Sequence, residues 1–305
     1  MRDNDHQRKG LSLLLVLLFS LPVNAEKIIQ GVIQNGDNII VAKGDIPTPD
    51  KFKNNILNYR QKAVEQLIQV EQALDKLIIS SENNALNDAQ NYYQQAHYHY
   101  EMVRPIIALF GNTERLLNNR ADFFPEGENS PRFSGFHLVE YQLFVLKDLP
   151  KVTQSAKALQ RNIQDLKKRL EIEDIPIPKL VQSADDSLEL ILIDKLAGAE
   201  NRYAHSDLGD SYANLQGSRI IIEILAEHIP PKEYQSIIAQ YDKIGDQLLK
   251  YQRDTGLFEP LDTLSENEKS WLFSQITQLA EKIATLRGTL NIDVYYHYKE
   301  SGDEK

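Results

Sequence analysis

The stretch FKNNILNYRQKAVEQLIQVEQALDKL, residues 52–77, decides the fold class of this protein. Its apolar residues recur at intervals of three and four, at Phe52, Ile56, Tyr59, Ala63, Leu67, Val70, Leu74 and Leu77. This spacing places them on one narrow stripe of an α-helix whose opposite face is polar. The stretch therefore predicts a long helix that packs its stripe against a partner.

The same pattern returns twice along the chain. The later stripes are Val152, Ala156, Leu159, Ile163, Leu166 and Leu170, and then Leu272, Ile276, Leu279, Ile283, Leu286 and Leu290. Weaker helical patterns cover residues 84–110, 178–203, 206–229 and 231–253, with loops expected at 111–132, 172–178 and 254–265. We therefore expect an all-α fold of long antiparallel helices in one or two bundles.

A short β-like segment precedes the helices. Residues 27–46 contain β-branched runs, Ile28-Ile29 with Val32-Ile33 and then Ile39-Ile40-Val41, on either side of Asn35-Gly36-Asp37. This turn has the composition of a β-hairpin. Twenty residues are too few for an independent domain, so residues 26–49 are expected to be a short N-terminal extension or linker.

The first 25 residues have the composition of a secretory signal peptide. Arg2, Arg8 and Lys9 precede an apolar run at residues 11–21, and a small-residue ending follows at Ala25. We expect cleavage after Ala25 and an exported protein with no integral membrane segment after cleavage. The alternative is a retained membrane anchor, although eleven apolar residues are short for a helical span.

The overall composition narrows the classes of function. The 305 residues include 34 basic and 44 acidic side chains, a net charge of −10, and no cysteine. The net negative charge argues against a nucleic-acid partner, because binding nucleic acid requires a concentrated basic face. A negatively charged surface attracts small cations instead. Without cysteine there is no disulfide, no thiolate metal site and no lipid attachment at an N-terminal cysteine, so the protein is not expected to be a lipoprotein.

One short motif has the spacing of a metal site. In Gly135-Phe136-His137-Leu138-Val139-Glu140, the histidine and the glutamate are three residues apart and share one face of a helix. The alternative is a solvated or salt-bridged pair, and His297 with Glu300 has the same spacing in a polar tail. The apolar surroundings of His137 and Glu140 favour a site, because buried polar groups need partners.

Two further segments carry groups that could bind an ion. His97 and Glu101 lie one turn apart in a tyrosine-rich helix, and Arg104 lies three residues beyond Glu101. From the spacing alone, we interpret this segment as a packing seam in which Arg104 neutralises Glu101. Near the junction of two predicted helices, Ser206 or Asp207 is expected to cap the next helix, whereas Glu200 has no such local role.

Four segments in the same order resemble a known family. They are Tyr98-His99-Tyr100-Glu101 with Pro105 to Phe110, Phe133 to Glu140, Glu200 to Leu208, and Leu286-Arg287-Gly288-Thr289-Leu290. Together they look like the EfeO/EfeM family, the periplasmic component of a bacterial iron-uptake system, which is related to the imelysin-type, peptidase-like domain. The similarity runs from about residue 50 to residue 293.

The resemblance implies two four-helix bundles over residues 50–293, followed by a polar tail at residues 294–305. It implies a non-enzymatic protein of an EfeUOB-type system that binds a metal ion and passes it to a membrane permease. The metal ligands carried over from the family are His137, Glu140, Glu101 and Glu200. The implied ion is ferrous or ferric iron, with zinc as a further candidate, and the implied partners are the iron permease and the other components of the system.

Two positions depart from the family pattern. Arg104 occupies a position where the family commonly has a second glutamate, and Asn118 lies near an expected aspartate. A guanidinium adds a fixed positive charge beside the ion, and the amide removes a negative one. We also expect no N-terminal cupredoxin-like domain, for which residues 26–49 are too short, so the chain resembles the short, EfeM-like form.

Two other functions remain open from the sequence. One is an imelysin-like zinc peptidase, although a zincin needs a second histidine next to the motif and Tyr141 follows Glu140. The other is a binding module for a polyanionic ligand or a metal chelate, which Arg104 and Asn118 favour because a basic residue in an acidic cavity attracts a carboxylate.

Overall fold

The computed structural model describes residues 33–35, 38–41, 48–292 and 296–298. It divides the chain into a small unit of strands and a large helical unit, residues 48–292 of which are described. The expected signal peptide, residues 1–25, lies outside the described residues, as do Ile28, Ile29 and Val32. None of the helices in the described ranges combines the length and the apolar character that crossing a bilayer requires.

The small unit is a three-stranded antiparallel sheet. Strands β1 (Ile33–Asn35) and β2 (Asn38–Val41) pair on either side of the expected turn, with Ile33 opposite Ile40. Strand β3 (Tyr296–Tyr298) pairs with the other edge of β2. The hairpin partners therefore agree with the sequence pattern, whereas the third strand lies in the segment expected to be a polar tail.

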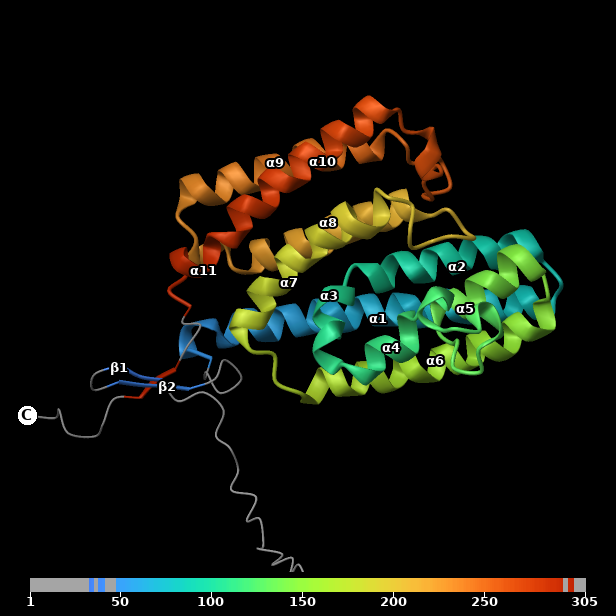
Figure 1. Ribbon diagram of the computed structural model, residues 1–305, viewed down its shortest axis with the longest axis horizontal. Coiled ribbons are helices and arrows are strands. Elements are labelled where there is room, and N and C mark those ends of the chain that lie inside the picture. Colours follow the sequence, from blue (N-terminus) through green and yellow to red (C-terminus); the bar gives the residue numbers. More distant parts are fainter. Residues whose placement is uncertain (1–32, 36–37, 42–47, 293–295, 299–305) are drawn as a thin grey trace, which may run out of the picture. The chain divides into compact units, whose positions relative to one another are not determined.

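The helical unit begins with a bundle built on three long helices. Helix α1 (Lys53–Glu82) packs against α2 (Leu86–Glu101) and α6 (Leu149–Ile172), as Figure 1 shows. Short helices lie along α2 and α6 in place of a continuous fourth helix. They are α3 (Arg104–Ile107), α4 (Asn112–Asn118), α5 (Phe136–Glu140) and the π-helix η6 (Tyr141–Leu146).

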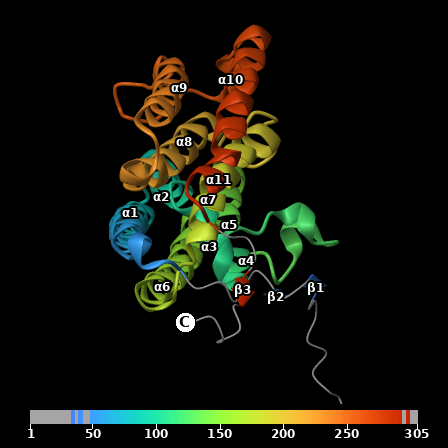
Figure 2. The same cartoon turned by 90° about the vertical axis from the view of Figure 1, so that its left-hand side faces the viewer.

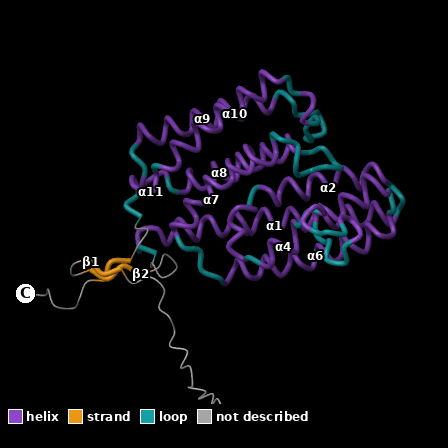
Figure 3. Tube along the Cα trace, viewed as in Figure 1, coloured by secondary structure: helices purple, strands orange, loops and turns teal. Residues whose placement is uncertain are grey.

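A second bundle follows in the chain. Helix α7 (Ile177–Leu190) continues into the π-helix η7 (Ile191–Lys195) and packs against α8 (Asp207–Ile224) and α10 (Glu266–Ala284). Helix α9 (Pro231–Leu249) covers α8 and α10, and α11 (Leu286–Thr289) completes the unit. In the view of Figure 2, α9 and α10 lie apart from α1 and α6. Figure 3 shows that most of the helical unit is helix and little of it is loop. The predicted all-α class with two bundles is confirmed.

Short 3-10 turns fill several connections. They are η2 (Asp50–Phe52), η3 (Ala108–Phe110), η4 (Ala121–Phe123), η5 (Gly127–Asn129), η8 (Ala226–His228) and η9 (Leu261–Thr263). Their presence and that of α4 mean that the expected loops at 111–132 and 254–265 are partly helical.

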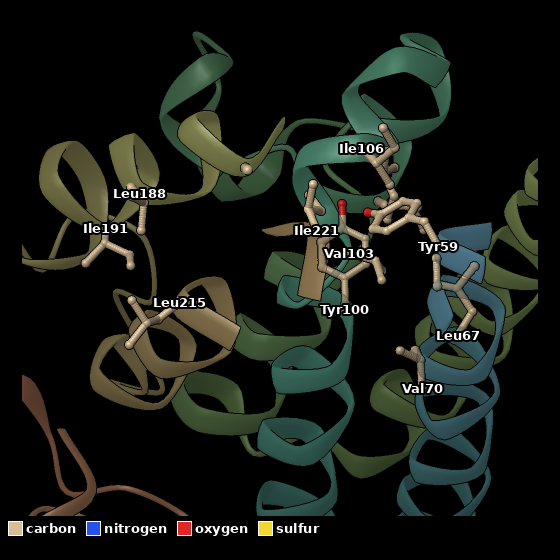
Figure 4. Close-up of a cluster of buried hydrophobic side chains, with 14 of the residues drawn as sticks. Tyr59, Leu67, Val70, Tyr100, Val103, Ile106, Leu188, Ile191, Leu215 and Ile221 are labelled. Carbon is tan, nitrogen blue, oxygen red and sulfur yellow. The ribbon is translucent and has the colours of Figure 1, made fainter. Parts of the chain in front are cut away.

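The apolar stripes form the core as predicted. The eight residues of the first stripe, Phe52 of η2 and seven of α1, are all buried, each at most 8% exposed. Side chains from both bundles meet in one continuous hydrophobic cluster, part of which Figure 4 shows, with Tyr59 and Leu67 of α1 near Val103 and Ile106. Transfer of apolar surface from water, at roughly 25 cal/mol per Å², is the main contribution that holds the helices together.

Two predicted helices are shorter than the sequence pattern suggested. The helix predicted over 84–110 breaks after Glu101. Pro105 has no backbone N–H to donate, and its ring would clash with the backbone of the preceding turn in a continuous helix. The pattern over 178–203 changes to a π-helix at Ile191 and ends at Lys195. Both breaks place an ionisable residue, Glu101 or Lys195, at a helix end in the interior.

Candidate functional site

The four residues expected to bind a metal ion lie in one buried cluster. Glu101 is the last residue of α2, His137 and Glu140 lie on α5, and Glu200 lies in the loop between η7 and α8. Each is at most 2% exposed. The fold therefore brings together three segments that are far apart in the sequence.

Helix α5 is placed by a glycine that no other residue can replace without strain. Gly135 has a φ of 79°, and a Cβ atom there would lie 2.1 Å from the carbonyl oxygen of Leu117. Only glycine adopts this conformation freely and permits the close approach of the α4 backbone. This contact fixes where His137 enters the cluster.

Glu140 orients His137. The Nδ1 atom of His137 lies 2.8 Å from Oε2 of Glu140. The other carboxylate oxygen of Glu140 accepts hydrogen bonds from the backbone N–H groups of Tyr203 and Ala204, at 3.0 and 2.8 Å. Glu140 is thus fully engaged, and the Nε2 atom of His137 is left buried without a hydrogen-bond partner, 3.8 Å from Oε1 of Glu200.

A second histidine has the same arrangement. The Nδ1 atom of His97 on α2 lies 2.8 Å from Oδ2 of Asp210 on α8, and Asn201 also donates to this oxygen, at 2.5 Å. The Nε2 atom of His97 has no hydrogen-bond partner and lies 3.4 Å from Oε1 of Glu101. Each imidazole is therefore oriented by a carboxylate on one side and directs its other nitrogen to a different carboxylate.

An ammonium group lies among these acids. Lys195, at the end of η7, is fully buried. Its Nζ atom is 2.9 Å from Oε2 of Glu200, 3.3 Å from Oε1 of Glu101 and 3.8 Å from Oδ2 of Asp210. The centre of the cluster therefore contains a cation that belongs to the chain.

Both departures from the family pattern contact Glu200. Arg104 donates to Oε1 of Glu101 at 3.2 Å and also to Oε1 of Glu200. Asn118 donates to the same oxygen of Glu200 at 2.9 Å. The interpretation that Arg104 neutralises Glu101 is confirmed, and Arg104 neutralises Glu200 as well.

The charges in the cluster support one another's ionisation. Burial by itself opposes ionisation of Glu200, but Arg104 and Lys195 hold the pKa of Glu200 well below its usual range. Burial likewise favours neutral His137, yet the hydrogen bond with Glu140 and the negative charges of Glu140 and Glu200 raise the pKa of His137 to about 9. Paired charges of this kind are tolerated in an interior where isolated ones are not.

The donor atoms are suitable for a metal ion, but Lys195 and Arg104 occupy the space between them. Imidazole nitrogens and carboxylate oxygens are common ligands of iron and zinc. Within the described residues, however, no group of three or more His, Asp or Glu side chains has the geometry to hold a metal ion as it is arranged. The cluster is therefore closed by its own cations.

Two cavities, each of about 290 Å³, adjoin the cluster from different directions. One reaches Arg104, and its wall carries four carboxylates, from Glu114, Asp186, Glu189 and Asp194. The other reaches Asp210 between α2, the start of α8 and the segment 252–258. The first has the charge that attracts a cation.

Comparison with known proteins identifies the family of this chain. The model of the Imelysin family (Peptidase_M75) matches residues 57–286. The chain belongs to the imelysin family. The match covers most of both helical bundles and every residue of the buried cluster.

The curated relatives of this imelysin-family chain include proteins of iron uptake. It is 33% identical over 211 residues to "Iron uptake system component EfeO" of Escherichia coli (strain K12) and to the protein of that name from Shigella flexneri. The protein of the same name from Shigella boydii serotype 4 is 32% identical. The alignment covers 68% of this chain and 56% of each relative, so the chain spans little more than half the length of these proteins.

Sequence reasoning missed two members of the cluster of this imelysin-family chain, Asp210 and Lys195, and it named His97 but preferred to interpret it as part of a packing seam. Tyr93 and Tyr100 stack on His97, as expected of a packing seam. This interpretation left out the contacts of His97 with Asp210 and Glu101. A signal for Lys195 existed: a single lysine in the apolar run 188–196 needs a buried carboxylate.

The expected helix cap was wrong. Ser206 is the residue before α8, but its hydroxyl makes no capping hydrogen bond. Asp207 accepts hydrogen bonds from the backbone and side chain of Asn201 instead. This contact ties the loop that carries Glu200 to α8.

Proposed function

We propose that this chain is a non-enzymatic, periplasmic component of an EfeO-type iron-uptake system, which binds an iron ion in the buried cluster and delivers it to a membrane permease. The names of the relatives support the iron-uptake role. The expected signal peptide supports the location.

One observation carries the proposal: two buried imidazoles, each oriented by a carboxylate, face two further carboxylates. Histidines that bind metals in proteins usually donate their other ring N–H to a carboxylate or carbonyl, which fixes the ring and its tautomer. Asp210 and Glu140 provide this for His97 and His137. The open Nε2 atoms and the carboxylates of Glu101 and Glu200 then form a donor set suited to iron.

In this proposal Glu140 differs in role from the other predicted ligands. Its oxygens are engaged by His137, Tyr203 and Ala204, so it positions His137, whereas Glu101 and Glu200 contact the ion. The place of the ammonium of Lys195 supports the proposal, because this compact cation is paired with Glu101 and Glu200.

The test is a titration of the purified protein with Fe²⁺ under anaerobic conditions and with Zn²⁺, followed by calorimetry. We expect about one ion per chain, and His137→Ala should lose at least tenfold in affinity. His205→Asn is the matched control, since His205 is exposed and its φ of 55° is one that asparagine tolerates. Absence of binding by the unaltered protein to either ion would remove the proposal.

No contact in the cluster favours the peptidase alternative. A zinc peptidase needs a carboxylate free to activate water. Glu140, the glutamate of the motif, is committed to three hydrogen bonds and orients His137. The anion-binding alternative is equally unsupported, because both buried cations already have carboxylate partners.

A further inference from the structure

Lys195 contacts three acids of the cluster and has no exposure to solvent. Its ammonium lies within 4 Å of carboxylate oxygens of Glu101, Glu200 and Asp210. A buried lysine would ordinarily lose its proton, because burial disfavours the charged form. Here Glu101, Glu200 and Asp210 surround the Nζ atom, so Lys195 is placed as the counter-ion of these acids.

We propose that Lys195 sets the cation affinity of the cluster, because its ammonium occupies the space between Glu101 and Glu200 that an incoming metal ion takes. The inference rests on the proposed function and names the residue that regulates it. An ion that bridges the two carboxylates must displace the ammonium, so part of its binding free energy is lost in breaking these ion pairs.

The other buried cation, Arg104, is less suited to this role. Its side chain is 12% exposed and lies at the edge of the cluster, where it also approaches Glu114 at 3.8 Å. It lines the acidic cavity, whereas Lys195 does not. Arg104 therefore lies at the side from which a cation approaches, and Lys195 occupies the centre.

Asp210 is a further acidic partner toward which Lys195 can move. Its Nζ atom is 3.8 Å from Asp210, farther than from Glu200 or Glu101. A shift toward Asp210 would release Glu200 while keeping the ammonium paired. Lys195 is also the last residue of a π-helix, an element often found at functional sites, and the helix ends there.

The test compares Lys195→Met with Lys179→Met. Methionine keeps the length of the side chain and removes its charge, and Lys179 is an exposed lysine on α7 whose removal leaves the cluster intact. The probes are Zn²⁺ and, under anaerobic conditions, Fe²⁺, measured by calorimetry and by the thermal midpoint with and without metal. We expect K195M to bind at least tenfold more tightly than the unaltered protein, and K179M to match it.

The outcomes separate the two proposals. If the unaltered protein binds metal and K195M binds no more tightly, the role of Lys195 is wrong and the proposed function stands. If only K195M binds metal, the role of Lys195 is supported, and the proposal that the unaltered protein binds metal fails. If neither binds, both proposals fail. Should K195M be too unstable to purify, Lys195→Gln, whose amide can still donate to Glu200, replaces it.

Discussion

At the scale of single residues, Glu140 and Asp210 each accept a hydrogen bond from the Nδ1 atom of a buried histidine. The two pairs come from different helices, yet both leave Nε2 directed toward another carboxylate. The cluster thus contains two imidazoles and four carboxylates. Lys195 and Arg104 compensate part of the negative charge of the carboxylates. A cluster of this kind is stable only while its members remain paired, because a single uncompensated charge in the interior is costly.

The pKa of His137 makes stability depend on pH. Because Glu140 and Glu200 outweigh burial and raise this pKa to about 9, the contribution of His137 is complete below its ordinary value of 6.5 and is lost as pH rises through 9. We expect the free energy of unfolding to fall between pH 7 and pH 9.5, by at most about 3 kcal/mol from this residue. Denaturant unfolding at several pH values checks this.

The control for this prediction is the pair His137→Asn and His205→Asn. His137→Asn should be less stable at pH 7 and should show a shallower loss toward pH 9.5, whereas His205→Asn should follow the unaltered protein. Equal slopes in all three proteins would contradict the assignment of this pH dependence to His137.

At the scale of elements, the short helix α5 matters more than the long ones, because it carries His137 and Glu140. The long helices were predictable, since their three- and four-residue periodicity is strong. The break of the fourth helix of the first bundle into α3, α4 and α5 was not, because it depends on contacts between segments. Gly135 illustrates this: its necessity comes from the Leu117 carbonyl, which no local pattern reveals.

Gly135→Ala should therefore be costly. The added Cβ meets the Leu117 backbone at 2.1 Å, and φ is positive, so we expect a loss of about 3 kcal/mol in stability. Gly256→Ala is the matched control, because Gly256 has a φ of 83° with nothing within 4 Å and should lose only about 1 kcal/mol. Chemical denaturation measures both, and similar losses would show that the contact with α4 is not what requires glycine.

At the scale of the whole helical unit, the cluster lies where the two bundles meet. Asn214 of α8 donates both to the backbone carbonyl and to the side chain of Glu101 on α2, at 2.8 and 2.9 Å. Sequence reasoning could name Glu101, His137 and Glu200 through family resemblance. It could not place Asp210 or Lys195 with them, because their meeting depends on how α8 and η7 pack against α2.

The junction of the bundles depends on a close approach at Gly217. A Cβ there would lie 2.1 Å from the carbonyl oxygen of Met102, one residue after Glu101. Gly217→Ala should cost about 2 kcal/mol, although alanine favours a helix. Gly245→Ala on α9, whose nearest neighbour would be at 3.7 Å, should instead gain about 0.5 kcal/mol. Thermal unfolding distinguishes the two, and a gain in both variants would show that the bundles can separate without cost.

The most direct test of whether iron binds in the buried cluster is anomalous diffraction from crystals of the purified protein soaked with iron. We expect one strong iron peak between the carboxylates of Glu101 and Glu200, within coordination distance of the Nε2 atoms of His97 and His137, with the ammonium of Lys195 displaced. An iron peak elsewhere, with the ion pairs of Lys195 to Glu101 and Glu200 unchanged, would contradict this expectation.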